Sequence, residues 1–133
     1  MKDVRVFLLA VLATCPSLAI SQGQVPSTDS QFEFCEDRPL EPEWMGSLPS
    51  RENYKRLVIQ TIYRAQGVER VVEAGECSCE TRFPSWDAAV QSFNDNYLGA
   101  DRNSLREANN EYLERFNELR QPARSICEAE GHW

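Results

Sequence analysis

Cys77 and Cys79 are separated by a single residue, Ser78, and this C-x-C segment is the first place in the chain where chemistry can be sought. A disulfide between two cysteines so close in sequence closes a strained ring, and strained disulfides are easily reduced. One hypothesis is therefore a thiol–disulfide oxidoreductase or isomerase that uses this pair. Glu76 and Glu80 flank the pair, however, and neighbouring negative charge disfavours the reactive thiolate.

Zinc binding is a second hypothesis, because Cys77, Cys79, Cys127 and His132 together offer three sulfur ligands and one nitrogen ligand. Their spacing departs from that of structural zinc sites, and an oxidising compartment would compete for the thiols. His132 is the only histidine and lies beside the last residue, which is a poor place for a catalytic triad. The sequence also has no glycine-rich phosphate loop. We therefore expect no catalytic residue, no metal and no cofactor, and a protein that is not an enzyme.

A structural role for the cysteines is the third hypothesis, and the one that we favour. Small exported chains use an even number of cysteines mainly as a disulfide framework. If the strained 77–79 bond is set aside, two pairings remain. Either Cys35 pairs with Cys77 and Cys79 with Cys127, or Cys35 pairs with Cys79 and Cys77 with Cys127. In both pairings the C-x-C segment joins an N-terminal arm to the end of the last helix.

The even count depends on removal of an N-terminal leader. Residues 1–21 combine a positively charged start, an apolar run and small residues before a cut at Gln22, a pattern typical of a secretory signal peptide. Pro16 interrupts the apolar run, which is also shorter than the about 20 residues that a membrane span needs. Cleavage removes Cys15, so four cysteines remain. An alternative is a bacterial lipoprotein signal in which Cys15 carries the lipid. We expect an exported chain, periplasmic or secreted.

The charge of the chain limits its partners. The formal net charge is −7, and the acidic residues are scattered rather than grouped in one block. An acidic surface argues against nucleic acid and anionic membranes as partners. Lys55 is the only lysine beyond the leader, and such a preference for arginine favours a bacterial periplasm over an animal secretory pathway. We expect the partner to be another envelope or secreted protein.

Residues 22–49 are predicted to form an extended arm, because four prolines break any helix and no strand-like alternation persists. The larger apolar side chains of the arm are expected to pack onto a helical body; they are Phe32, Phe34, Leu40 and Trp44. For Trp44 and Trp133 the sequence leaves two roles open. Each either packs on the body or forms part of an interaction surface.

Residues 50–74 are predicted to form the first long helix. Its apolar residues follow the alternating four- and three-residue spacing of one helix face. Ser50 is the expected N-cap and Gly75 the expected stop. Gly67 costs roughly 1 kcal/mol relative to alanine inside a helix, so we consider a break at this position.

Two further helices are predicted after the C-x-C segment. The first covers residues 85–97 and is expected to be capped by its opening serine. The second begins near Asp101 or Ser104 and continues to Cys127, with a kink expected where Pro122 removes one backbone donor. The fold is therefore an all-α bundle of about three helices in residues 50–133, with an extended N-terminal arm and two disulfides. A core of this size benefits from such cross-links.

The stretch ECSCETRFPSWD, residues 76–87, follows a leader and a helix, and in this it resembles small exported accessory proteins of bacterial type IV secretion and conjugation systems. The resemblance covers these twelve residues alone. It implies a periplasmic accessory component without catalytic residues. We therefore expect a non-enzymatic protein that binds an envelope assembly. The alternatives are the C-x-C oxidoreductase and a small secreted inhibitor or ligand-binding helical protein.

Overall fold

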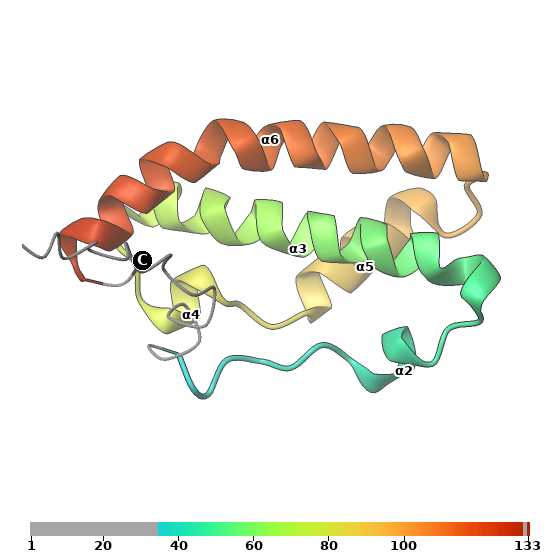
Figure 1. Ribbon diagram of the computed structural model, residues 1–133, viewed down its shortest axis with the longest axis horizontal. Helices are drawn as coiled ribbons and strands as arrows, with labels where there is room; N and C mark the ends of the chain where they lie inside the picture. The colour runs from blue at the N-terminus through green and yellow to red at the C-terminus, as the bar shows by residue number, and fades with distance from the viewer. Residues whose placement is uncertain (1–34, 132) are drawn as a thin grey trace, which may run out of the picture.

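The computed structural model describes residues 35–131 and 133; the predicted leader, Phe32, Phe34 and His132 lie outside the described residues. In chain order the elements are α2 (Glu43–Gly46), η1 (Ser50–Glu52), α3 (Asn53–Ala74), α4 (Cys79–Arg82), α5 (Asp87–Tyr97) and α6 (Arg102–Ala129). The described part contains no strand, so the predicted all-α fold is confirmed. Figure 1 shows α6 above α3, with α4 and the arm below them and α5 crossing behind α3.

The two long helices, α3 and α6, run parallel to each other. Side chains paired across them, or just beyond the end of α3, are separated by 48, 46 and 50 residues, and an almost constant separation requires that both chains advance in the same direction. The pairs are Thr61–Asn109, Glu69–Arg115 and Cys77–Cys127. Parallel neighbours need a return element between them, and α5 takes this role by running back along α3 (Figure 1).

Buried side chains form two clusters along α3. The larger cluster joins the arm, α3, α5 and the start of α6; its fully buried members include Met45, Ile59, Ile62, Ala89 and Leu105. The smaller cluster lies where α3 and α6 end; it comprises Val68, Val71, Cys77, Ala123 and Cys127. The smaller cluster contains both Cys77 and Cys127. Their side chains therefore form part of the apolar core.

The sequence predictions for α3 were right at its end and wrong at its start and middle. Gly75 ends the helix in the left-handed conformation, with φ of 68°. Ser50 does not cap the helix; it is the first residue of η1, which leads into α3 without a side-chain cap. Gly67 does not break the helix, which continues to Ala74. A Cβ at this position would lie 2.7 Å from the backbone oxygen of Arg82. The glycine therefore serves the close approach of α4 rather than a bend.

The starts of the two later helices were only partly predicted. α5 begins at Asp87 instead of residue 85, and Ser85 donates to the Asp87 carboxylate at 3.1 Å instead of capping the backbone. α6 is capped by Asp101, whose carboxylate accepts from the backbone N–H of Asn103 at 2.8 Å and of Ser104 at 3.0 Å. These two hydrogen bonds lower the pKa of Asp101, because they stabilise the ionised carboxylate.

Pro122 is accommodated inside α6. The helix runs without interruption to Ala129, although proline cannot donate a backbone hydrogen bond. Figure 1 shows the C-terminal turns of α6 bending towards α4. The bend brings Cys127 to the C-x-C segment.

In the described part of the arm, Met45 packs into the core in place of the predicted Leu40 and Trp44. Leu40 is 83% exposed and Trp44 is 47% exposed, whereas Met45 is fully buried in the larger cluster. The arm also contains one short helix, α2, where an irregular chain was expected. Because α2 is a single helical turn, it turns Met45 inward while the larger indole of Trp44 stays outside.

Candidate interaction groove

The C-x-C segment joins two disulfides, as predicted, and the structure selects one of the two pairings. Cys35 bonds to Cys79 with a Cα–Cα distance of 5.6 Å, and Cys77 bonds to Cys127 with a Cα–Cα distance of 5.0 Å. Each member of the C-x-C pair is therefore joined to a distant element, which leaves no strained 77–79 bond. The three sulfurs of the hypothetical zinc site are likewise engaged in disulfides.

Local hydrogen bonds explain why the C-x-C segment turns between its two cysteines. Ser78 caps α4 by accepting from the backbone N–H of Thr81 at 3.2 Å. The Thr81 hydroxyl donates to the Glu76 carboxylate at 2.6 Å, and this bond lowers the pKa of Glu76. The backbone N–H of Cys77 donates to the Glu130 carboxylate at 3.0 Å. The segment is thus fixed by polar contacts as well as by sulfur.

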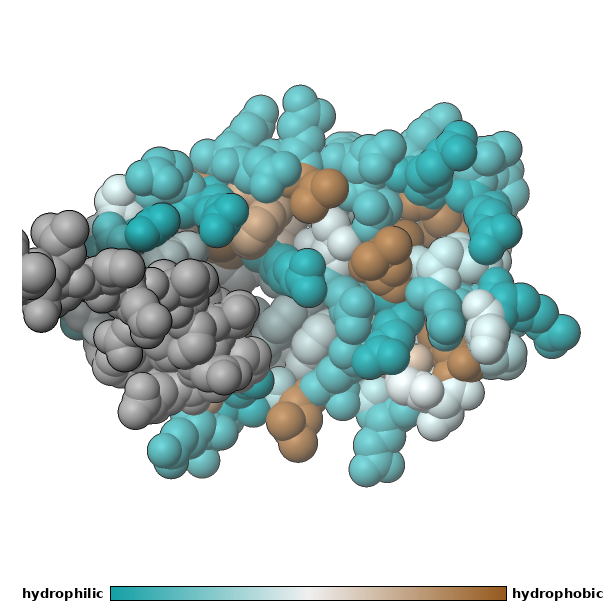
Figure 2. Space-filling model, viewed as in Figure 1, coloured by the Kyte–Doolittle hydropathy of each residue, from teal (hydrophilic) through white to brown (hydrophobic). Residues whose placement is uncertain are grey.

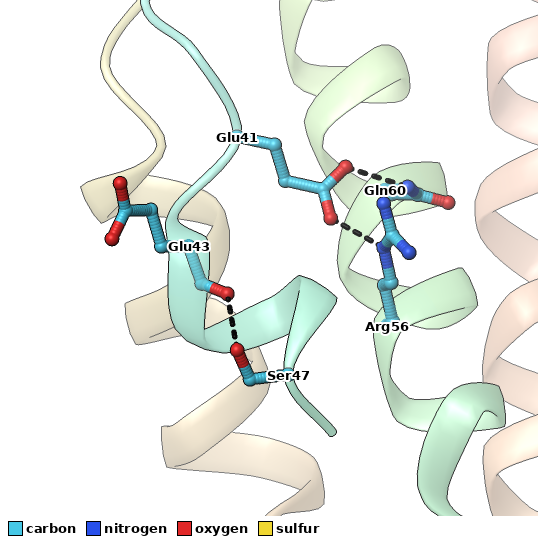
Figure 3. A network of polar contacts seen from close by, with 5 residues as sticks. All are labelled: Glu41, Glu43, Ser47, Arg56 and Gln60. Carbon is cyan, nitrogen blue, oxygen red and sulfur yellow. Dashed lines mark hydrogen bonds and ion pairs between the residues drawn. The ribbon is translucent and has the colours of Figure 1, made fainter. Parts of the chain in front are cut away.

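The arm is held along α3 by one carboxylate. Glu41 forms an ion pair with Arg56 and accepts a hydrogen bond from the Gln60 amide at 2.7 Å (Figure 3). Partial burial raises the pKa of Glu41, but the hydrogen bonds from Arg56 and Gln60 and the Arg56 charge outweigh it, so the pKa is lowered overall. Glu43 is on the same segment, and Figure 3 shows its carboxylate pointing away from Arg56.

An aromatic stack forms the wall of a groove beneath the arm. The rings of Tyr63 on α3 and Trp86 at the start of α5 are stacked, with centroids 3.9 Å apart and planes 5° apart. Trp86 donates its indole N–H to the backbone oxygen of Pro39 at 3.1 Å. Tyr63 donates its hydroxyl to the backbone oxygen of Pro84 at 3.0 Å, and burial raises its pKa. Both rings are therefore fixed in orientation before any ligand arrives.

The groove that these rings border has a volume of about 620 Å³. Five aromatic side chains line it: Tyr63, Phe83, Trp86, Phe116 and Trp133. Four arginines line it as well: Arg38, Arg64, Arg82 and Arg120. Glu41 is the only acidic residue among its lining residues in the described part of the chain. Figure 2 shows one face of the molecule, on which apolar residues are scattered among hydrophilic ones.

Trp133 lines the groove and contacts two arginines. The Arg82 guanidinium lies 4.6 Å from the centroid of the Trp133 ring and 5.1 Å from that of Phe83. Such cation–π contacts favour a planar guanidinium over a lysine ammonium. Partial burial lowers the pKa of Arg82, since it disfavours the charged form. Arg124 lies on the Trp133 ring as well, 5.9 Å from its centroid.

The structure separates the two tryptophans that the sequence grouped as an interaction surface. Trp133 lines the groove, whereas Trp44 lies on α2 and does not. Sequence reasoning missed Tyr63, Phe83 and the arginines as parts of one site. The signal was hard to find, because these residues come from the arm, α3, α4 and α6 and share no local pattern.

In the described part of the chain, no helix is both long and apolar enough to cross a membrane. No protein-family model, no curated protein and no solved structure matches this chain.

Proposed function

We propose that this chain is an exported, non-enzymatic protein that binds another envelope or secreted protein through the groove. The observation that carries the proposal is the position of the two disulfides. They meet at the C-x-C segment and hold the arm on one side and the end of α6 on the other, and both elements line the groove. The cross-links thus stabilise the part of the molecule that presents aromatic and arginine side chains.

The composition of the groove supports binding to a protein. Tryptophan, tyrosine and arginine are the residues most enriched among those that carry binding energy at protein interfaces. The Tyr63–Trp86 stack and the hydrogen bond from Trp86 to Pro39 fix the aromatic side chains in advance. A prearranged site loses less conformational entropy when a partner binds.

Two further points extend the proposal to the compartment and the assembly. Disulfides persist in oxidising compartments, and an exported chain with a cleaved leader fits a bacterial periplasm. The resemblance of residues 76–87 to type IV secretion accessory proteins supports an envelope assembly of that kind as the partner. These residues include the C-x-C segment and Phe83, which lines the groove.

The proposal is tested by photo-crosslinking in the native host. A photoreactive phenylalanine analogue at Phe83 is expected to trap a specific envelope protein, because this side chain lines the groove. The same analogue at Leu113, which is 42% exposed on α6 and lies outside the groove, is the matched control. Adducts that form equally from both positions, or no adduct from Phe83, would contradict the proposal.

A further inference from the structure

The charge of the groove is opposite to that of the molecule as a whole. The chain carries a net charge of −7, yet among the described residues four arginines and a single carboxylate line the groove. That carboxylate, Glu41, is already paired with Arg56 and Gln60, so it offers little to a cationic ligand. A concave surface of one sign concentrates ligands of the opposite sign.

Two of these arginines are directly available in the described part of the chain. Arg64 on α3 and Arg120 on α6 are both exposed, and neither has an ion pair or hydrogen-bond partner among the described residues. Each presents a planar set of donors that suits a carboxylate. Aromatic rings line the same groove and would receive an apolar side chain.

The register of α3 and α6 sets the spacing of the two arginines. Because paired positions on the two helices differ by 46 to 48 in number, Arg120 lies opposite residues 72–74 of α3. Its distance from Arg64 along the helix axis is therefore about 12 to 15 Å, at 1.5 Å per residue. An extended peptide covers this distance with roughly four to five residues, at about 3.3 Å each.

We infer that the groove binds an extended acidic segment of the partner protein, in which two carboxylates flank an aromatic residue. In an extended chain, residues i, i+2 and i+4 face one side, so a Glu-x-Phe-x-Glu pattern presents carboxylate, ring and carboxylate together. The two carboxylates would meet Arg64 and Arg120, and the ring would lie among the aromatic side chains. This inference rests on the proposed function and adds the chemistry of the partner.

The test uses the chain from Gln22 onward, with both disulfides formed and with ¹⁵N-labelled tryptophan. The chain has three tryptophans, and each gives one indole N–H signal in the NMR spectrum. Trp86 and Trp133 line the groove, and Trp44 on α2 is the internal control. The probe is the acetylated pentapeptide Glu-Ser-Phe-Ser-Glu. The control peptides replace both glutamates with lysine, or the phenylalanine with serine.

The probe is expected to shift the Trp133 and Trp86 signals saturably and to leave Trp44 unchanged. Each control peptide should bind at least about tenfold more weakly, since it lacks the charged hydrogen bonds or the ring. The double substitution Arg64→Glu with Arg120→Glu should abolish the shifts at unchanged thermal stability. Arg106→Glu, at an exposed position of α6 outside the groove, should leave them intact.

Equal binding of all three peptides, or equal shifts at Trp44, would overturn the inference. Binding that arises only after Asp29, Phe32, Glu33 and Phe34 are replaced by Asn, Ala, Gln and Ala would also overturn it, because a segment of this same chain would then be the occupant. The crosslinking and peptide experiments distinguish a failure of this inference from a failure of the proposed function. If crosslinks form at Phe83 in the host while no peptide binds, the acidic ligand is wrong and the protein partner stands.

Discussion

Gly67 of α3 and Arg82 of α4 are in backbone contact, so close that a Cβ on residue 67 would lie 2.7 Å from the Arg82 carbonyl oxygen. Real Cβ atoms do not approach a carbonyl oxygen so closely. The contact fixes the position of α4, and with it the Arg82 and Phe83 side chains that line the groove. Gly67 is unfavourable in a helix by propensity alone, but packing against α4 requires a glycine at this position.

Replacing Gly67 with alanine should destabilise the protein, although alanine is favoured in helices by about 1 kcal/mol. The added Cβ must push α4 away or distort α3. Urea unfolding measures the change in the free energy of unfolding. The matched control is Gly46→Ala in α2, where a Cβ meets nothing within 4 Å and should be tolerated. If the Gly67→Ala protein were as stable as wild type, the two helices would not be in the contact described.

The two disulfides should contribute differently to stability. Replacing Cys77 and Cys127 with alanine should lower the free energy of unfolding by about 2–5 kcal/mol, because this bond constrains the unfolded chain and fills a core cluster. Replacing Cys35 and Cys79 removes the sulfur anchor of the arm and should lower global stability less, since neither cysteine belongs to a described core cluster.

Urea unfolding and amide hydrogen exchange together distinguish the two effects. In the Cys35 and Cys79 variant, exchange should accelerate first in the arm, and the indole N–H of Trp86 should lose protection because its acceptor, Pro39, is in the arm. Equal losses of global stability in both double variants would argue that the Cys77–Cys127 bond has no special role in the core.

The contact between the arm and α3 should weaken in acid. The pKa of Glu41 is lower in the folded protein than its ordinary value of 4.5, so the carboxylate stabilises the fold at higher pH. This stabilisation should be complete above about pH 4.5 and disappear as the pH falls through the lower folded pKa. Glu41→Gln should therefore be less stable than wild type at neutral pH and nearly equal to it in strong acid.

The control for this experiment is Glu43→Gln, which changes a neighbouring carboxylate that points away from Arg56 (Figure 3). Its unfolding free energy should follow that of wild type at each pH. A Glu41→Gln protein with the same pH profile as wild type would show that the ion pair adds nothing to stability.

A polar contact joins α3 to α6. The Thr61 hydroxyl is buried and lies 2.8 Å from the Asn109 side-chain oxygen, within hydrogen-bond distance. A double-mutant cycle with Thr61→Val and Asn109→Ala should give a coupling energy of about 1 kcal/mol, since the two residues share one hydrogen bond. Asn110→Ala is the control, because Asn110 is exposed. If the effects of Thr61→Val and Asn109→Ala were simply additive, the contact between these two residues would contribute nothing to stability.

The three longest helices, α3, α5 and α6, could be predicted from sequence because each carries an apolar face with helical spacing. The Gly75 stop and the presence of two disulfides followed from equally local rules. The errors have a common cause, which is contact between distant elements. Gly67 was considered as a break because its neighbour, Arg82, is not visible in the local sequence. Trp44 was expected to pack on the body because of its size, and Met45 was not considered. In the structure Met45 is buried and Trp44 is exposed.

The short helix α4 and the groove could not be predicted from local sequence patterns, because both depend on contacts between separate elements. A helix of four residues does not form on its own, since nucleation is costly; Ser78 and the two disulfides stabilise it. The groove combines side chains from four separate elements, and only Trp133 among them had been predicted as part of an interaction surface. Its arginines looked like ordinary exposed positions on helices.

The arrangement of the cysteines also has a mechanical consequence. The sulfur bridges and the three residues of the C-x-C segment form one covalent path from Cys35 to Cys127. Tension applied between the arm and the end of α6 would be carried by this path, so α3, α5 and the first turns of α6 would bear no load. The opposite end of the bundle, at Gly99, has no such bridge. The molecule is therefore inextensible at one end and compliant at the other, and reduction of either disulfide would transfer the force to the helices.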